Sequence, residues 1–511
     1  MASYSSHSRP QRGKIAAWAA LIGGLLVIIL SAFFVGAVTG IDPSIAARLV
    51  VVMLVPLFFS VIWSAPKQKG DPGLWLNHLL LLALMISIFW PPYVFFSFHG
   101  LPSLDPKRLL MMGIAMLWVY KVMSSSVMGA RFWSRIRLGG WQLTVLMLYM
   151  AWRLISAGAS PFPIPSLVQF VWEAIYYYLA FYVTLAALRD TGAARRLVML
   201  LVYAALGIVL VSVAEHFAGH NLFAKLVPAN ADYADMQAAV LADKLRDGGN
   251  RVQATFEHPM VLAEYVVFML PLVTFGAMTA ARKSVRLACL VGVPLLFGVI
   301  LMSGTRSAIL TGGAIMVLSS GLYFLRNVQD GNMSLKAFFS ILALIALVMG
   351  TLASASVVTQ LIQGRNGGER GSSTSRLLQM RAAVPKIQKE PLLGYGVGVG
   401  NGELGFKSSR GRMSVDNYYL TLALDSGLPG AALYILFTAG FCWMGVRMYF
   451  TQGPDETRIL GGMLGLSILG VLVTKTVLSI DKNLTFVFVG FAILIVLKEH
   501  MQQSRDAVGH A

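Results

Sequence analysis

LVMLLVYAALGIVLVSVAE, at residues 197–215, is the stretch of sequence that decides the fold. It carries no charge before its last residue, Glu215. A helix of about 20 apolar residues crosses the roughly 30 Å of hydrocarbon in a bilayer and satisfies its backbone hydrogen bonds internally. The stretch therefore predicts a membrane-spanning helix that ends where a polar insert begins.

Thirteen further apolar stretches resemble it, and together they predict an all-α, polytopic transmembrane bundle of 12–14 helices. Of the 511 residues, 57% are hydrophobic and only 13% are charged, so lipid is the solvent that this composition requires. We expect the N-terminal stretch, residues 16–38, to be a membrane helix and not a cleaved signal peptide, because it is long and lacks a cleavage site of small residues. The other stretches are residues 16–38, 46–64, 75–97, 108–124, 141–158, 168–188, 259–280, 285–302, 307–325, 336–357, 428–449, 458–479 and 484–498.

Basic residues cluster in alternate loops of this bundle. The net charge of +18 could suggest nucleic-acid binding, but the alternation is the positive-inside pattern of a membrane protein. With fourteen spans, it predicts that both termini are cytoplasmic and that most of the charge serves topology. The clusters are Lys67 and Lys69; Arg131, Arg135 and Arg137; Arg189, Arg195 and Arg196; Arg282, Lys283 and Arg286; Arg326 and Lys336; and Arg447 and Arg458.

Two long polar inserts, 215–257 and 358–418, then lie outside the cytoplasm together with the turn at 303–306. Within the second insert, residues 375–389 place apolar and basic side chains on different helix faces, which predicts a short amphipathic helix at the membrane interface. The chain divides into N-terminal transmembrane helices at 1–193, a region at 194–500 that contains both inserts, and a cytoplasmic tail at 501–511.

Four arginines lie on these outer segments: Arg251, Arg306, Arg376 and Arg381. A guanidinium group offers two parallel donors to an anion such as a phosphate, so their convergence predicts a basic pocket. Arg251 could instead meet lipid headgroups, and Arg306 could extend towards lipid phosphate.

Acidic and imidazole groups accompany the arginines. His258 and Glu257 precede Pro259 at the start of a span, where Glu257 could cap the helix. Asp416-Asn417 opens a short helical stretch. Aspartate at a helix start is a common N-cap, whereas a carboxylate among arginines can act as a general base, and the sequence leaves both roles open for Asp416.

Other sequence patterns mainly argue against a nucleotide-binding loop and a metal site. The glycine-rich run at 394–402 lacks the Gly-Lys-Ser/Thr signature of a phosphate-binding loop, so we expect a flexible wall or lid. Cys289 and Cys442 lie inside spans, and the inserts show no metal-ligand spacing, so neither a metal nor another cofactor is expected. Arg153 and Glu173 lie in the outer halves of two spans and predict a structural ion pair.

Several of these segments resemble motifs of the O-antigen ligase and Wzy-type polymerase superfamily, which assembles bacterial envelope polysaccharides. The similarity covers roughly residues 194–496. Its motifs are RVQATFEHPMVLAEYVVFMLP at 251–271, SGTRS at 303–307, Arg376 followed by PLLGYGVG at 391–398, and Asn417 followed, after nine residues, by GLPG at 427–430. Where the ligase pattern has a histidine before that asparagine, this chain has Asp416.

The resemblance implies a metal-independent glycosyltransferase of the bacterial inner membrane, with periplasmic inserts and a polyprenyl-diphosphate-linked glycan as substrate. The arginines would bind the diphosphate together with Asn417, and Asp416 would be the general base, with His258 as the second candidate. Fixed charge that meets charge developing in the transition state is usually the largest catalytic contribution.

We therefore predict a polymerase of exopolysaccharide or O-antigen repeat units, with a flippase and a chain-length regulator of the same pathway as partners and no nucleic acid. The alternative within this class is an O-antigen ligase that transfers glycan to lipid A-core. The alternative of another class is a transporter of lipid-linked sugars or polysaccharide. Transporters typically show related halves and broken mid-membrane helices, whereas the charges here lie at one rim.

Overall fold

The structure is a computed structural model. The structure describes residues 73–95, 105–226, 245–246, 249–329, 367–405 and 415–509. The predicted spans at 16–38, 46–64 and 336–357 lie outside these residues.

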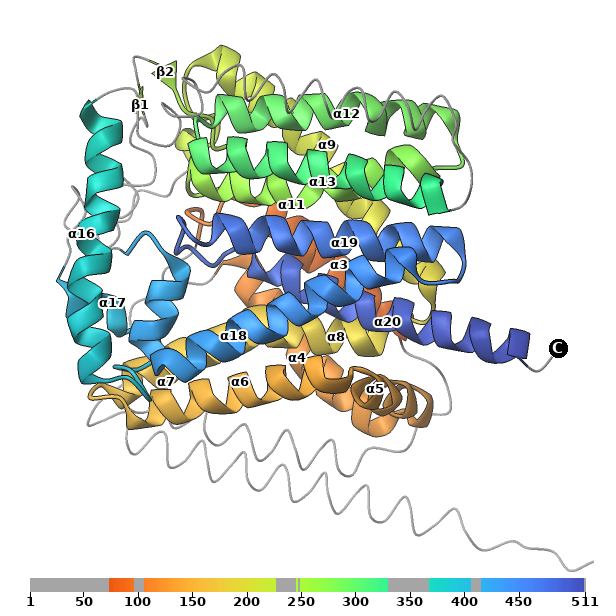
Figure 1. The fold of residues 1–511 in the computed structure, drawn as a ribbon, viewed down its shortest axis with the longest axis horizontal. Helices are drawn as coiled ribbons and strands as arrows, with labels where there is room; N and C mark the ends of the chain where they lie inside the picture. The colour runs from red at the N-terminus through yellow and green to blue at the C-terminus, as the bar shows by residue number, and fades with distance from the viewer. Residues whose placement is uncertain are drawn as a thin grey trace, which may run out of the picture.

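The described chain is an all-α bundle with one two-stranded hairpin (Figure 1). Eight of its helices are long and apolar enough to cross a membrane, as expected for a multi-pass membrane protein. The elements are α3 (Gly73–Phe89), α4 (Pro106–Ser124), α5 (Ser126–Leu138), α6 (Gly140–Ala159), α7 (Pro163–Glu173), the π-helical turn η1 (Ala174–Tyr178), α8 (Leu179–Ala187), α9 (Thr191–Ala218), the 3-10 turn η2 (Ala224–Leu226), β1 (Leu245–Arg246), β2 (Gly249–Asn250), α11 (Pro259–Thr279), α12 (Lys283–Met302), α13 (Arg306–Gln329), α16 (Gly367–Lys389), α17 (Gly400–Leu404), α18 (Tyr418–Phe450), α19 (Asp455–Thr474) and α20 (Leu484–Gly509).

Each predicted span that falls within the described residues coincides with a helix, so the all-α membrane fold is confirmed. Several helices differ in extent from the prediction. Helix α18 begins at Tyr418 and merges the predicted short stretch with the following span, and α20 continues to Gly509. Helix α5, which carries Arg131, Arg135 and Arg137, was expected to be a loop.

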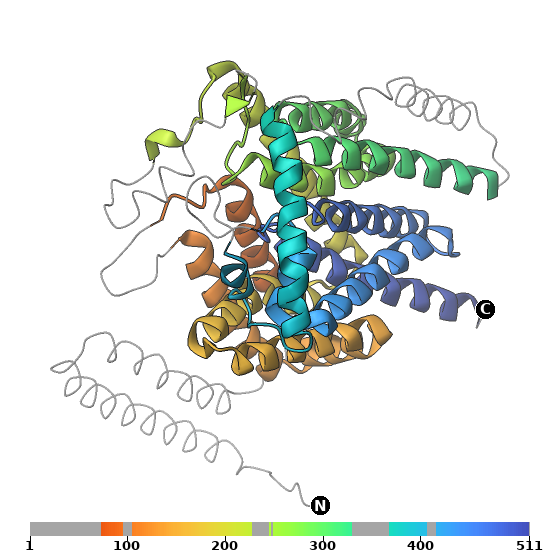
Figure 2. The ribbon, with the colours of Figure 1, turned by 60° about the vertical axis from the view of Figure 1, so that its left-hand side comes forward.

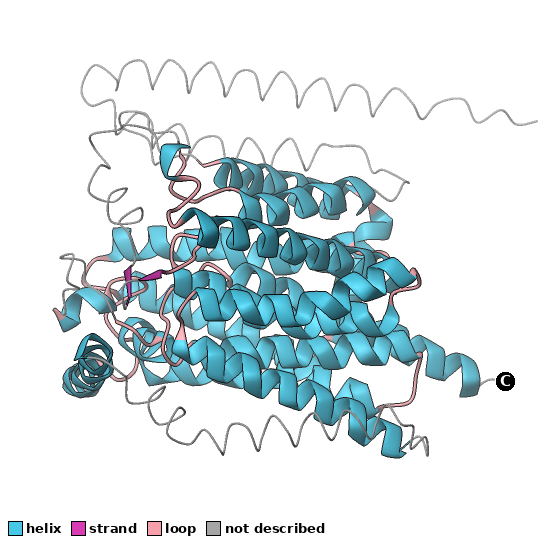
Figure 3. Cartoon of the chain, turned by 90° about the horizontal axis from the view of Figure 1, so that it is seen from above, coloured by secondary structure: helices cyan, strands magenta, loops and turns pink. Residues whose placement is uncertain are grey.

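Helix α16 crosses one end of the bundle, which we call the α16 end (Figures 1 and 2). The long helices run between this end and the opposite one, where α20 finishes. Figure 3 shows the same arrangement from above, with the hairpin at one end of the aligned helices. The described parts of both long inserts and the α12–α13 turn therefore meet at the α16 end, as the topology predicts.

Helix α16 is amphipathic in another way than predicted. Its buried side chains are Gln379 and Ala383, which are 6% and 0% exposed, whereas Leu377, Met380 and Val384 are about half exposed. Tyr395, Val415 and Leu424 form one small core with Ala383. The apolar residues of the predicted amphipathic helix thus lie largely exposed on α16.

Candidate functional site

All seven sequence-predicted site residues lie at the α16 end of the bundle, but on different elements. Arg251 and His258 belong to the segment between β2 and α11, and Arg306 is the first residue of α13. Arg376 and Arg381 lie on α16, and Asp416 and Asn417 directly precede α18.

Arg251 is joined to the turn that carries Arg306. Its Nε donates to the carbonyl oxygen of Ser303 at 2.8 Å, and an Nη donates to the hydroxyl of Thr305 at 3.2 Å. Gly304 allows the close approach, because it has φ +59° and an added Cβ would lie 3.3 Å from Arg251 Nε. Arg306 starts α13, where the helix dipole is positive and disfavours a cation. A bound anion would relieve that repulsion.

Helix α16 holds Asp416 from two sides. The backbone N–H of Asp416 donates to Gln379 Oε1 at 2.9 Å, and its Oδ2 lies 3.8 Å from Arg376 Nε. Asn417, rather than Asp416, caps α18, since Asn417 Oδ1 accepts from the N–H of Leu420 at 3.1 Å. The capping role that the sequence left open for Asp416 is therefore wrong, and its carboxylate is placed beside an arginine instead.

Arg381 is exposed, five residues along α16 from Arg376. In a helix of 3.6 residues per turn, five residues correspond to about 140° of rotation, so the two guanidinium groups start from different faces. Arg376 is oriented towards Asp416, whereas Arg381 stays at the surface.

His258 caps α11, the role that the sequence suggested for Glu257. Its Nδ1 accepts from the N–H of Met260 at 3.1 Å. A neutral imidazole whose Nδ1 accepts carries its proton on Nε2, so that nitrogen can donate a proton but cannot remove one. This geometry favours Asp416 over His258 as the base.

A buried polar network missed by the sequence analysis lies below the start of α18. Lys475 and Glu264, 0% and 1% exposed in their side chains, form an ion pair at 3.0 Å. Glu264 also accepts from Thr474 at 3.1 Å and from Asn483 at 3.0 Å. Lys475 lies over the ring of Tyr418, 5.3 Å from its centroid, and its carbonyl oxygen accepts from the Tyr418 N–H at 3.0 Å. The signal for this network was the pair of charges within apolar spans.

The predicted ion pair between Arg153 and Glu173 is confirmed, and Asp425 joins it at 3.4 Å. Asp425 in turn accepts from the N–H groups of Gly398 and Gly400 at 3.0 and 3.1 Å. The glycine-rich loop is thus hydrogen-bonded to α18 at its kink, an arrangement that fits the wall of the predicted wall or lid.

Glycine is required at the kink itself. Gly427 has φ +67°, and an added Cβ would lie 2.1 Å from the carbonyl oxygen of Leu392. The N–H of Leu428 donates to the carbonyl oxygen of Pro391 at 2.8 Å, which ties the end of the loop to α18 beyond the kink.

A cavity of about 270 Å³ opens at the α16 end, between α3, α4, η1, α11 and the start of α20. We call it the Lys107 cavity. Its charged lining residues are Asp105, Lys107, Arg108, Glu257 and Lys482. Burial, together with the nearby charge of Lys482, lowers the pKa of Lys107 from 10.5 to about 8. None of the seven predicted residues lines this cavity, although Glu257 precedes His258 directly.

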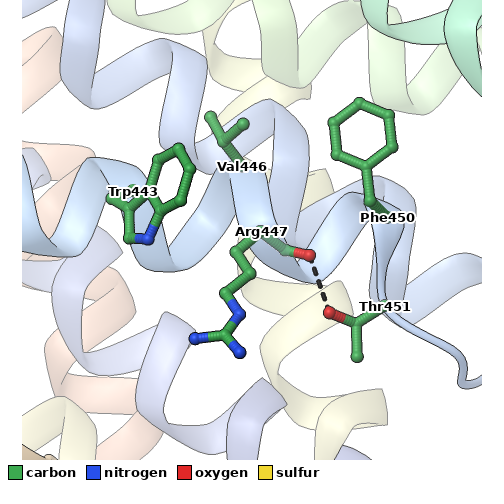
Figure 4. Close-up of a pocket in the computed structure, with 5 residues that line it drawn as sticks. All are labelled: Trp443, Val446, Arg447, Phe450 and Thr451. Atoms are coloured by element: carbon green, nitrogen blue, oxygen red, sulfur yellow. Dashed lines mark hydrogen bonds between the residues drawn. The ribbon is translucent and has the colours of Figure 1, made fainter.

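A second hollow lies at the far end of α18 (Figure 4). Thr451 Oγ1 donates there to the carbonyl oxygen of Arg447 at 2.7 Å, and Trp443 is 63% exposed. An exposed tryptophan beside an arginine is typical of side chains that anchor a helix at the lipid headgroups. Its lining residues are Trp443, Val446, Arg447, Phe450 and Thr451.

Comparison with known proteins gives one result that bears on this site. No curated protein matches the chain. The model of one protein family, described as O-antigen ligase, matches residues 291–435. This range covers less than half of the chain, and it contains Arg306, Arg376, Arg381, Asp416 and Asn417. The match supports a glycosyl-transferring membrane enzyme of the ligase or polymerase type that acts on lipid-linked glycans. Residues 291–435 are therefore similar to O-antigen ligases.

Proposed function

We propose that the protein is a metal-independent glycosyltransferase that polymerises glycan repeat units carried on polyprenyl diphosphate, at the periplasmic face of the bacterial inner membrane. The observation that carries the proposal is the approach of Arg376 to Asp416 inside the matched region, 3.8 Å apart. The Arg376 guanidinium can bind a diphosphate, and the Asp416 carboxylate can accept the proton of the hydroxyl group that displaces it.

The reaction is a single displacement. The acceptor hydroxyl attacks the anomeric carbon of the donor sugar, the bond between that carbon and the diphosphate oxygen breaks, and polyprenyl diphosphate leaves. Asp416 takes the proton of the hydroxyl, and Arg251, Arg306 and Arg376 stabilise the charge that develops on the diphosphate. Guanidinium groups suit this role because they bind phosphate oxygens in pairs.

The polymerase is favoured over the ligase by one feature of the sequence. The ligase pattern has a histidine before Asn417, and this chain has Asp416. Purified protein given only lipid-linked repeat units should therefore produce a ladder of polymers, without lipid A-core as the acceptor.

Asp416→Asn tests the base. Because Asn417 caps α18, the substitution leaves the cap in place and removes only the carboxylate. Transfer should fall about 10²–10⁴-fold, the usual contribution of a general base, while the amount of protein in the membrane stays near normal. The exposed Asp506, at the opposite end of the bundle, supplies the matched control Asp506→Asn, which should be fully active. A fully active Asp416→Asn enzyme would exclude the base role.

A further inference from the structure

The Lys107 cavity lies outside the residues that match the O-antigen ligase family, and the proposed mechanism does not use it. Its wall comes from the end of α3, the start of α4, the η1 turn and the start of α20. Tyr176 and Tyr177 line it from η1, a π-helical turn inside an otherwise α-helical segment. Such turns are frequent at functional sites, because they change the direction of the side chains around them.

The charges of this cavity are largely matched. Arg108 lies 3.4 Å from the carboxylate of Asp105 and donates to the hydroxyl of Tyr176 at 2.9 Å. At the exposed rim, the Glu257 carboxylate raises the pKa of Lys482. A diphosphate needs an excess of positive charge, as the arginines of the matched region could supply. This lining has three cations against two carboxylates, and its single excess positive charge, with the pKa of Lys107 lowered to about 8, favours a neutral polar ligand over a diphosphate.

The remaining lining suits carbohydrate. Lys107 and Lys482 offer donors, and Asp105 and Glu257 offer acceptors, a mixture that can bind the donor and acceptor functions of sugar hydroxyl groups. Aromatic side chains complete the wall, and their faces can pack on the apolar side of a sugar ring. The volume of about 270 Å³ is at the small end for ligand sites and suits a single sugar unit. The aromatic lining residues are Trp90, Phe95, Tyr176, Tyr177, Phe256 and Phe486.

We propose that the Lys107 cavity binds a sugar unit of the glycan substrate. The proposal rests on the proposed function, which makes glycan the substrate. The buried network connects the cavity to the base: Asn483 lines the cavity and donates to Glu264, Glu264 pairs with Lys475, and the Lys475 carbonyl oxygen holds the start of α18 two residues after Asp416. A sugar held in this cavity would thus be bound by elements in fixed relation to Asp416.

Protection of Lys107 from acylation tests the proposal on the full chain in lipid nanodiscs. With a pKa of about 8, the Lys107 amine should react readily at pH 8, and mass spectrometry of its peptide measures the extent. The probe is the repeat-unit oligosaccharide of the host, released from its lipid carrier by mild acid and therefore free of diphosphate. We expect it to protect Lys107 severalfold, whereas inorganic pyrophosphate should not. Protection by pyrophosphate alone, or by neither probe, would overturn the proposal. Lys283, on the opposite end of the bundle, serves as the unprotected reference.

Two variants separate this proposal from the proposed function. Glu257→Gln removes a charged acceptor, so about tenfold more oligosaccharide should be needed for the same protection. Undiminished protection in this variant would contradict the cavity site. Asp416→Asn should lose transfer yet keep full protection of Lys107. If Asp416→Asn keeps its transfer activity, the base assignment fails while the protection result still decides the cavity.

The pH dependence supplies an independent measurement. Lys107 faces Asp105, Glu257, Asp481 and Lys482, and its pKa of about 8 leaves it protonated below pH 8 and neutral above it. If its ammonium group donates to a sugar hydroxyl, inhibition of transfer by the free oligosaccharide should weaken as the pH rises from 7 to 9. Lys107→Arg stays charged and should abolish this pH dependence. The same pH dependence in both proteins would contradict a role for Lys107.

Discussion

At the α16 end, α18 and α11 each begin beside a candidate general base. In α18 a neighbouring residue caps the helix, whereas in α11 the candidate base is itself the cap. At α18, the cap is Asn417, so the preceding Asp416 is available to pair with Arg376. At α11, the cap is His258 itself, whose Nδ1 is occupied by the N–H of Met260. Asparagine and aspartate cap about equally well, so the order of the two residues before α18 cannot be interpreted without the coordinates.

His258→Asn tests the capping assignment. Asparagine is among the best N-cap residues, so this variant should keep both the stability and most of the transfer activity of the protein. His258→Ala removes the cap acceptor and should lower the free energy of unfolding by about 1 kcal/mol. Membrane abundance and initial transfer rate measure the two effects. A stable His258→Asn protein without activity would show that the imidazole takes part in the reaction.

Residue roles could be predicted only where a charge occurs in an unusual context. Arg153 and Glu173 lie in apolar spans, where an unpaired charge is costly, and their pairing followed from that cost. Lys107, by contrast, lies at the start of α4, and its sequence context is that of an ordinary lysine at the membrane interface. The neighbouring Lys482 is far away in sequence, and the two lysines reach one cavity because α4 and α20 both pack against η1.

At the scale of elements, the Glu264–Lys475 pair holds three helices together below the site. Glu264 belongs to α11, Lys475 ends α19, and Asn483 precedes α20. A buried ion pair contributes little net stability, but removal of one partner leaves an unpaired charge that costs about 3–5 kcal/mol.

Lys475→Met should therefore reduce membrane abundance strongly, because the Glu264 carboxylate is left buried without its cation. Combining it with Glu264→Gln should restore much of the abundance, since neither charge then remains. Thermal unfolding in detergent measures the recovery. If the double variant is less stable than Lys475→Met, the two residues do not act as a pair.

The lengths of the apolar stretches predicted the positions of the membrane helices, but they did not predict the kinks and turns within those helices. The kink at Ser426-Gly427 and the π-helical turn at η1 depend on tertiary packing: the loop at 391–400 docks on the kink, and the tyrosines of η1 pack beside α4 and α20. A glycine-rich run is flexible only when nothing binds its backbone. Here Asp425 accepts hydrogen bonds from the N–H groups of Gly398 and Gly400, so this part of the run is docked on α18.

The two ends of the whole molecule differ in the setting of their basic residues. At the end opposite α16, arginines cluster around short connections, such as those between α5 and α6, α8 and α9, and α11 and α12. At the α16 end, they lie mainly in the long inserts. Because the positive-inside rule applies to short loops, this distribution predicts that the α16 end is periplasmic and that the opposite end is cytoplasmic.

Cysteine labelling in intact cells tests this orientation. Gln388 on α16 and Arg282 before α12 are both exposed, and they lie at opposite ends of the bundle. In a variant whose native Cys289 and Cys442 are replaced by alanine, Gln388→Cys should react with a membrane-impermeant maleimide once the outer membrane is permeable. Arg282→Cys should react only after the inner membrane is disrupted. The reverse pattern would place the arginines and Asp416 in the cytoplasm, where the proposed periplasmic transfer could not occur, and labelling of both without disruption would contradict the membrane-spanning arrangement itself.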